Sequence, residues 1–487
     1  MGNNVAVNRS RSQALRSRTR RWLQLCAGLV LCVLACLPVT GRPQAARAPL
    51  TAQQQIDAAP PRGVVVLEGR PYPEQLVIDK NLTLIGAGST TVIAAPETLN
   101  GYSLTPGGDT YYPVIYVHDA ASVTIQNLRV DGAGRGNDHS RFAGIVFHNA
   151  GGRVDTVEVV GVHDTPYSTA AHGTALYAYA NSGTARDLYV THCDFSEFQK
   201  NGAAFWGADL TAQVSNNTIA GRGPIHSVAQ NGIVIGSGVA GIVGPSNTLS
   251  GYSYTTAGTA ASGILIYAND AAVFNNSVVD SQVGIYLFQG GGDIYGNTVR
   301  AGDGAAEPWG IVATVGEIAR SDGGVFLTPS IDNSAQVLGS TAGLTITIAA
   351  NNLIGDGVNV DSTGIETDIG SDAGDVALLI EDNEITGWGE GVVLYRAAAA
   401  RAVDASSFAL RVNSIEGNLT YGVCAVGFIT SSVDAQQNWW GHNSGPYDES
   451  ASDGFFNPDG QGDAVSDGVN YLHWLRRTHL PLMFRDG

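Results

Sequence analysis

The chain has 487 residues, with 44 acidic and 26 basic side chains and a formal net charge of −18 at pH 7. Residues 1–48 hold eight of the basic residues and no acidic one, so the rest of the chain is more acidic still. A field of this sign repels nucleic acids and anionic membranes, and we expect neither as a partner.

The first 48 residues have the layout of a targeting segment. A basic stretch is followed by an apolar run from Trp22 to Val39 and then by small and polar residues, which is the plan of a secretory signal. The apolar run is near the lower limit for a membrane span, about 17 residues, so a retained or lipidated anchor is the alternative. We predict export to the cell surface or the extracellular space, with no membrane insertion beyond residues 1–48.

Two short patterns recur in step along the remaining residues. In the first, a glycine precedes four or five residues rich in Ile, Val, Leu and aromatic side chains, at spacings of 21 to 31 residues with one interval of 54 between Gly310 and Gly364. The second pattern is Asn-x-(Ile/Val/Leu). Its copies begin at Asn217, Asn247, Asn276, Asn297, Asn352, Asn383 and Asn413.

Such regular register favours a β-solenoid over a sandwich or a propeller, because each repeat can form one coil and equivalent residues then stack in rows. An asparagine at each turn suits this architecture, since its side-chain amide can bond the asparagines above and below. The interval of 54 predicts either a degenerate coil or an insertion.

The repeats resemble the right-handed parallel β-helix family of the pectin-lyase-like superfamily over about residues 60–434. The stretch GRPYPEQLVIDKNLTLIGAGSTTVI, from Gly69 to Ile93, is similar to the first coil of such proteins, and NWWGHNSGP, from Asn438 to Pro446, resembles a closing segment of bacterial surface members. The resemblance implies an all-β, right-handed parallel β-helix of about 12 coils in residues 49–434, followed by a closing segment and tail in residues 435–487. The resemblance is informative about the fold but does not identify a reaction.

An aromatic row follows from the alternation of side chains along a strand. Counting from each glycine, the first and third residues are apolar and are predicted to form the core, which places the fourth residue on the outer face. The fourth residues include Tyr177, Trp206, Tyr267 and Phe288. With coils about 4.8 Å apart these rings would span roughly 20 Å, enough for a short oligosaccharide. The alternative is that long turns fold over the rings and bury them.

Charged residues in the early turns are the candidates for catalysis. They are Asp164, Asp194, Lys200 and Arg222. Stacked coils would hold carboxylates about 5 or 10 Å apart, which brackets the pairs of retaining and inverting glycoside hydrolases. Resemblance to lyases of this fold implies another arrangement, with calcium among the aspartates and Lys200 or Arg222 as the base. The alternative is that these residues are solvated surface charges with a structural role only.

Cys193 and Cys424 lie in coils too far apart for a disulfide, so both are predicted to be free, buried thiols. No histidine and cysteine spacing predicts a zinc site. Calcium is the one cofactor that we consider, and besides the early aspartates it could be held by acidic residues of the closing segment, which are otherwise a solvated cap loop: Asp448, Glu449, Asp453, Asp459, Asp463 and Asp467. The sequence therefore predicts a monomeric, exported β-helix protein that binds extracellular polysaccharide. It leaves open whether the protein is an enzyme, and an enzyme of this kind would be a polysaccharide lyase or a glycoside hydrolase. The alternative is a non-catalytic adhesive or structural surface protein.

Overall fold

The computed structural model describes residues 49–105, 108–255, 259–302, 305, 307–316, 328–329, 343–370, 373, 375–396, 407–428 and 432–477. The chain divides into two units, Met1–Pro49 and Leu50–Gly487, and the second unit is the solenoid. The predicted secretory signal in residues 1–48 lies outside the described residues. Within the described part, no helix has the length and apolar character needed to cross a membrane.

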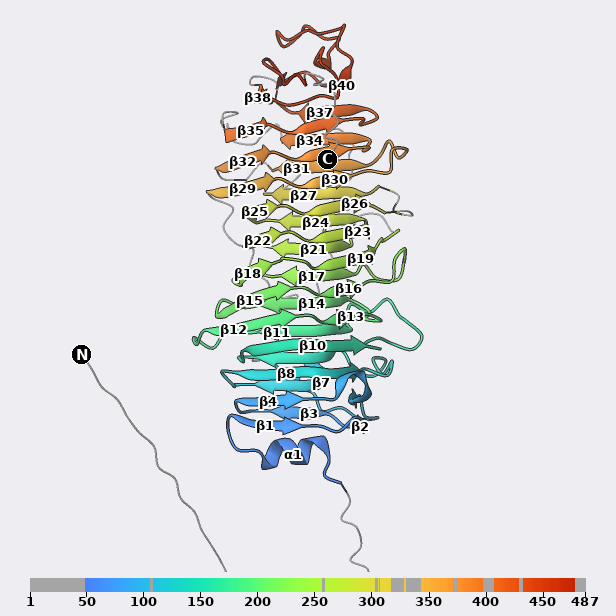
Figure 1. Cartoon of the computed structure of the whole chain (residues 1–487), viewed down its shortest axis with the longest axis vertical. Coiled ribbons are helices and arrows are strands. Elements are labelled where there is room, and N and C mark those ends of the chain that lie inside the picture. The colour runs from blue at the N-terminus through green and yellow to red at the C-terminus, as the bar shows by residue number, and fades with distance from the viewer. Residues whose placement is uncertain are drawn as a thin grey trace, which may run out of the picture. The chain divides into compact units, whose positions relative to one another are not determined.

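The solenoid is a right-handed parallel β-helix built from two long sheets (Figure 1). Each coil gives one strand to the first sheet, here called the single-strand sheet. In the described residues twelve strands follow one another in it, which confirms the predicted number of coils. They are β3 (Leu76–Ile78), β7 (Thr110–His118), β9 (Phe142–His148), β11 (Thr174–Tyr179), β14 (Asn201–Trp206), β17 (Asn231–Ile235), β21 (Ser262–Tyr267), β24 (Val283–Phe288), β27 (Trp309–Val315), β31 (Thr363–Ile369), β34 (Glu390–Arg396) and β37 (Tyr421–Val426).

The second sheet, here called the double-strand sheet, receives two short strands from most coils, or one long strand in their place. Its described strands are β1 (Gly63–Val66), β2 (Pro71–Pro73), β4 (Leu82–Ile85), β5 (Val92–Ala94), β8 (Val123–Asp131), β10 (Gly152–Val160), β12 (Arg186–Thr191), β13 (Asp194–Phe195), β15 (Leu210–Ser215), β16 (Thr218–Ala220), β18 (Ala240–Val243), β19 (Thr248–Tyr252), β22 (Asp270–Phe274), β23 (Ser277–Ser281), β25 (Gly291–Tyr295), β26 (Thr298–Ala301), β29 (Leu344–Ala349), β30 (Asn352–Ile354), β32 (Val376–Glu381), β33 (Glu384–Thr386), β35 (Phe408–Arg411), β36 (Ser414–Glu416), β38 (Val433–Asp434) and β41 (Val469–Asn470).

The remaining described elements are small. They are α1 (Ala52–Ala58), the 3-10 turn η1 (Gly88–Thr90), β6 (Tyr102–Ser103) antiparallel to β7, β20 (Thr259–Ala260) beside β28 (Thr328–Pro329), and β39 (Pro446–Tyr447) beside β40 (Gly462–Ala464).

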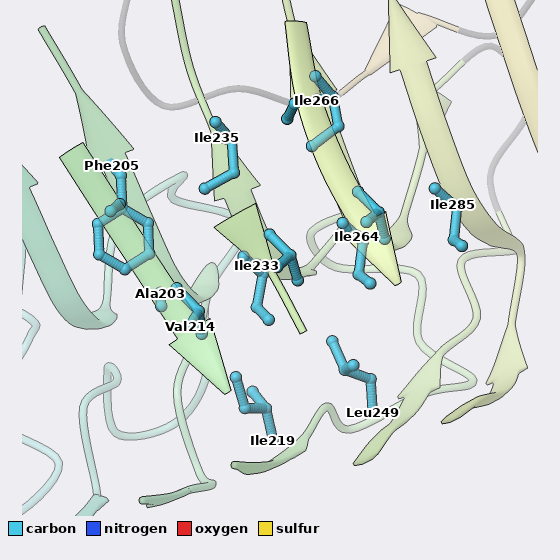
Figure 2. Close-up of a cluster of buried hydrophobic side chains, with 14 of the residues drawn as sticks. Ala203, Phe205, Val214, Ile219, Ile233, Ile235, Leu249, Ile264, Ile266 and Ile285 are labelled. Atoms are coloured by element: carbon cyan, nitrogen blue, oxygen red, sulfur yellow. The ribbon is translucent and has the colours of Figure 1, made fainter. Parts of the chain in front are cut away.

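The core consists of vertical rows of apolar side chains, as the glycine pattern predicted. Ile233, Ile264 and Ile285 are register partners on successive strands and are fully buried (Figure 2). The coil that contains Gly173 is shifted by two residues. Leu176 pairs with Ile145 there, so Ala175 stands where other coils have their glycine. The shift preserves which side chains face outward, but it places Tyr179 and not Tyr177 in the row of Trp206.

A buried asparagine ladder forms the corner between the two strands of the double-strand sheet. Its described rungs are Asn217, Asn247, Asn276, Asn297, Asn351, Asn383, Asn413 and Asn438. Each Nδ2 donates to the next Oδ1 at 2.8–3.0 Å and also to a backbone carbonyl of a neighbouring coil. The predicted rung Asn352 is wrong by one residue: Asn351 is the rung, and Asn352 faces outward in β30.

The interval of 54 residues is an insertion, not a degenerate coil. β27 pairs directly with β31, with Ile311 opposite Ile365, so no coil lies between them in the single-strand sheet.

Both ends of the solenoid are covered. At the first coil, α1 starts with a capping box at Thr51 and buries Ala52 and Ile56 in the main core. At the last coil, the Asp463 carboxylate accepts hydrogen bonds from Gly417 N and Asn418 N at 2.9 and 3.0 Å. These bonds fasten the closing segment to the last coils.

Candidate functional site

The predicted open aromatic face is wrong for three of its four rings. Tyr177, Trp206 and Tyr267 are buried in a second apolar cluster on the outer side of the single-strand sheet, and Trp206 is only 2% exposed. The outward residues beside them, such as Val146 and Leu265, are apolar as well. The rings and these neighbours form an apolar strip two residues wide. Covering the strip stabilises the folded protein, since burial of apolar surface contributes about 25 cal/mol per Å². Phe288 remains half-buried and stacks on Tyr267 with ring centroids 5.4 Å apart.

Trp206 has a particular place in this covered layer. The next coil has Gly236 in its row, and a Cβ built there would lie 1.8 Å from Trp206 Cε3. The indole therefore extends across the backbone of Gly236, and its buried Nε1 has no hydrogen-bond partner among the described residues. The missing side chain at residue 236 is what makes room for the ring.

Asp164 belongs to a buried polar cluster in the loop after β10. Its carboxylate accepts hydrogen bonds from Ser168 Oγ, from His172 Nε2 at 2.8 Å and from Gln199 Nε2 at 3.2 Å. Gln199 Oε1 in turn accepts from Asp164 N at 3.0 Å. Burial raises the pKa of Asp164, but the hydrogen bond from Ser168, the charge of His172 and the bond from Gln199 outweigh burial and hold the pKa below its ordinary value. This carboxylate is held by protein donors and fastens the loop to the next coil.

Asp194 does not join Asp164 in one site, whereas Lys200 directly follows Gln199, which bonds to Asp164. Asp194 is exposed on β13 and is the register partner of Glu158, so the expected stacked pair of Asp164 and Asp194 is not formed. Lys200 is fully buried and donates from Nζ to the carbonyl oxygen of Ala229. Turn lengths that differ from coil to coil shift these residues out of a common row.

Arg222 lies on the surface in another turn. Its guanidinium carbon is 3.2 Å from the centroid of the Tyr167 ring, and that ring stacks on His163 with centroids 4.0 Å apart. Cation–π packing of this kind steadies a turn and leaves no unoccupied base beside a carboxylate.

Replacing Asp164 by asparagine should lower the free energy of unfolding by about 2–4 kcal/mol at neutral pH, because a buried, hydrogen-bonded carboxylate is lost. The folded pKa is depressed, so this stabilisation is complete above the ordinary carboxyl value of about 3.9 and is lost as pH falls through the lower folded value. Urea unfolding from neutral to acidic pH should show the difference between wild type and D164N shrinking only below that ordinary value. The exposed Asp194→Asn is the matched control, and an equal loss in D194N would contradict the assignment.

An open groove of about 640 Å³ lies at the other end of the solenoid. It is lined by Gly355, Asp356, Gly357, Thr386, Gly387, Glu416, Gly417, Trp440, Gly441, Gln461 and Asp463. Thr386 and Glu416 are register partners, and glycines from four successive coils form the floor. At about 4.8 Å per coil the floor is about 15 Å long. Sequence reasoning missed this groove, although its signal is present: a glycine follows each of the last four ladder asparagines by three or four residues.

The groove presents acceptor oxygens and no basic group among its lining residues. Glu416 Oε2 accepts from Trp439 Nε1 at 3.0 Å, and Glu416 Oε1 lies 3.4 Å from Arg477 Nη1. Burial raises the pKa of Asp463, hydrogen bonds from Asn418 oppose the rise, and the charge of Glu416 adds to it. Carboxylates fixed in this way can accept hydrogen bonds from hydroxyl groups, whereas an anionic ligand would be repelled.

The thiols and acidic residues add no metal centre to the described part of the chain. There, no group of three or more His, Cys, Asp or Glu side chains is placed to hold a metal ion. In the closing segment, Asp448 accepts from Tyr471 Oη at 2.8 Å and is buried. Cys193 is a free, buried thiol whose pKa burial raises to about 12, and Cys424 is half-buried.

Searches against protein-family models and curated proteins find no match for this sequence. Among solved structures, the chain is similar to the family 28 exopolygalacturonase of Yersinia enterocolitica, with 11% identity over 77% of this chain and 71% of that one and a TM-score of 0.41. It is also similar to the GH136 lacto-N-biosidase of Eubacterium ramulus, with 12% identity over 69% of this chain and a TM-score of 0.40, and spans 58% of that chain's length.

A third similar structure is the A-module of the mannuronan C-5 epimerase AlgE6 of Azotobacter vinelandii, with 13% identity, coverage of 88% of this chain and 94% of that one, and a TM-score of 0.36. What the protein has in common with these structures is the parallel β-helix fold.

Proposed function

We propose that the protein is an exported polysaccharide-binding β-helix and that the groove from Gly355 to Asp463 is its binding site. The observation that carries the proposal is an open, glycine-floored channel about 15 Å long, edged by the carboxylates of Asp356, Glu416 and Asp463. Glycines let a sugar ring approach the backbone closely, and the carboxylates accept hydrogen bonds from its hydroxyl groups. The absence of basic lining residues favours a neutral glycan over a polyuronate.

Binding is better supported than cleavage. Both oxygens of Asp463 accept hydrogen bonds from the protein, and Glu416 is held by Trp439. Groups already committed to protein donors serve recognition more readily than proton transfer, which needs a carboxyl within reach of the glycosidic oxygen. Oligosaccharide release from the bound glycan that disappears in D463N would add hydrolysis or lyase chemistry to binding.

Export through residues 1–48 is part of this proposal, because the glycan is extracellular. We expect the mass of the mature protein, measured after secretion by its native host, to begin near residue 49. A mass that retains residues 1–48 would indicate the anchored alternative.

A stiff structural or adhesive surface protein is the second candidate. The covered rings of Tyr177, Trp206 and Tyr267 favour it, since they close the aromatic face proposed for sugars. The continuous asparagine ladder also suits a rigid spacer. This candidate predicts no affinity for any glycan.

Filling the groove separates the two candidates. Thr386 faces the groove from β33, so Thr386→Trp should place an indole across the floor and weaken binding at least tenfold, as judged by affinity electrophoresis in soluble neutral β-glucan, galactomannan and xylan. Asn352→Trp is the matched control, because Asn352 faces outward one strand away and does not line the groove. Retardation by a neutral glycan that T386W abolishes and N352W preserves supports the groove. No retardation by any of the three supports the spacer.

A further inference from the structure

An exposed ring and a half-buried ring are stacked on the outer face of the double-strand sheet, away from the groove. Phe274 in β22 and Tyr295 in β25 are register partners, and their ring centroids lie 5.1 Å apart with planes only 4° from parallel. Tyr295 is 40% exposed. Phe274 covers one face of the tyrosine ring, so the other face is directed along the solenoid toward the next coil.

The next coil places only a small side chain over that face. Its residue in this row is Ala349, and the coil after it contributes Glu381. Two coil spacings separate Tyr295 from Glu381, which is about 10 Å. The register therefore places a small residue between an aromatic ring and a carboxylate; this part of the row, from Tyr295 to Glu381, is here called the slot, and Arg411 follows Glu381 in the same row.

Polar side chains border the slot and have no partners of their own. Asp293 and Thr347 are register partners in the parallel row two residues earlier in the same strands. Within the described part of the chain, no hydrogen bond or ion pair involves the side chains of Asp293, Glu381 or Arg411. A ring stack that only held neighbouring coils together would be more stabilising if it were buried. This stack is open to solvent instead, and hydrogen-bonding groups without a protein partner among the described residues lie beside it.

We propose that this slot, bounded by Tyr295, Ala349 and Glu381, is a subsite for one neutral pyranose unit. The apolar C–H face of the sugar stacks on the Tyr295 ring, and its edge hydroxyls bond Glu381, Arg411 and Asp293. The asparagine corner, at Asn351, separates the slot from the groove strand β30, so the two sites lie on adjacent faces. The subsite is therefore occupied independently of the groove.

Saturation-transfer NMR with methyl β-D-glucopyranoside and methyl β-D-galactopyranoside tests the subsite, at the millimolar affinity expected of so small a ligand. Both the wild type and the groove-filled T386W should transfer saturation to the sugar ring protons. Tyr295→Ala should reduce the transfer at least fivefold, and Tyr295→Phe should retain it, because the aromatic face and not the hydroxyl forms the floor. Ala349→Phe should abolish it by continuing the ring stack into the slot.

Tyr189→Ala is the matched control, because Tyr189 faces outward from β12 on the same sheet, several coils away, and packs against Arg153. Transfer that survives both Y295A and A349F, or that Y189A reduces equally, overturns the subsite. Transfer lost in T386W places the sugar in the groove, which overturns the subsite and leaves the proposed function standing. Transfer retained in T386W with no polysaccharide retardation of the wild type overturns the groove and leaves the subsite standing.

Discussion

Replacing Asn351 by alanine should lower the free energy of unfolding by about 3–5 kcal/mol, the largest effect that we expect from one side chain. Asn351 Nδ2 donates to Asn383 Oδ1 at 3.0 Å and to Ile294 O at 2.8 Å, while its Oδ1 accepts from Asn297 N and Nδ2 at 2.9 and 3.0 Å. Alanine would remove these four buried hydrogen bonds at once and would take from Asn297 N the side-chain oxygen to which it donates, and a buried group that loses its partner costs about 1–3 kcal/mol. Denaturant unfolding followed by circular dichroism measures the loss.

The neighbouring residue supplies the control. Asn352 is outward and half-buried, and no hydrogen bond of its side chain is found among the described residues. Asn352→Ala should therefore change the free energy of unfolding by less than about 0.5 kcal/mol. Equal losses in N351A and N352A would show that the ladder is not what distinguishes the two positions.

Gly236→Val should destabilise the protein by about 3 kcal/mol, since the new side chain and the Trp206 ring cannot occupy the same space. The Cβ alone would approach Trp206 Cε3 and Cζ3 to 1.8 and 2.0 Å. The indole must leave its buried position, which forfeits the burial of a large ring and strains the coil. Unfolding midpoints measure the stability, and a red shift of tryptophan fluorescence reports the exposure of the ring.

Removal of the ring should relieve the clash. In a Trp206→Ala background, Gly236→Val should cost less than about 1 kcal/mol, so the double-mutant cycle should show strong coupling between the two positions. Additive losses would mean that valine at residue 236 acts on the backbone and not through the indole.

The sequence was sufficient to predict the fold because every coil repeats the same requirement. From Gly144 onward a glycine stands at the same place in nearly every coil, and from Asn217 onward an asparagine marks the corner. The prediction of the register was wrong at the two places where a different residue could fill the position of the glycine or of the asparagine. Ala175 is small enough to stand in for the glycine of its coil, and Asn351 and Asn352 both have an aliphatic residue two positions later, Leu353 and Ile354. Only the structure shows that Leu353 is the buried one.

The candidate site was less predictable, because it depends on what lies over a face. Strand alternation correctly assigned Trp206 and Tyr267 to the outer side of the sheet, but it carries no information on the loops that cover them. The stacking of Asp164 and Asp194 failed because turns of unequal length change the register. The groove exists because the glycines that line it have no side chains. Sequence reasoning that looks for reactive or charged residues does not consider glycine.

The covered ends of the solenoid bear on self-association. Parallel strands that end a stack present unpaired backbone groups that a second molecule could extend into a fibre. Here α1 seals the first rung with Ala52 and Ile56, and the segment anchored by Asp463 closes the last. A covered end offers fewer free backbone groups to the end of a second solenoid than a bare final strand would.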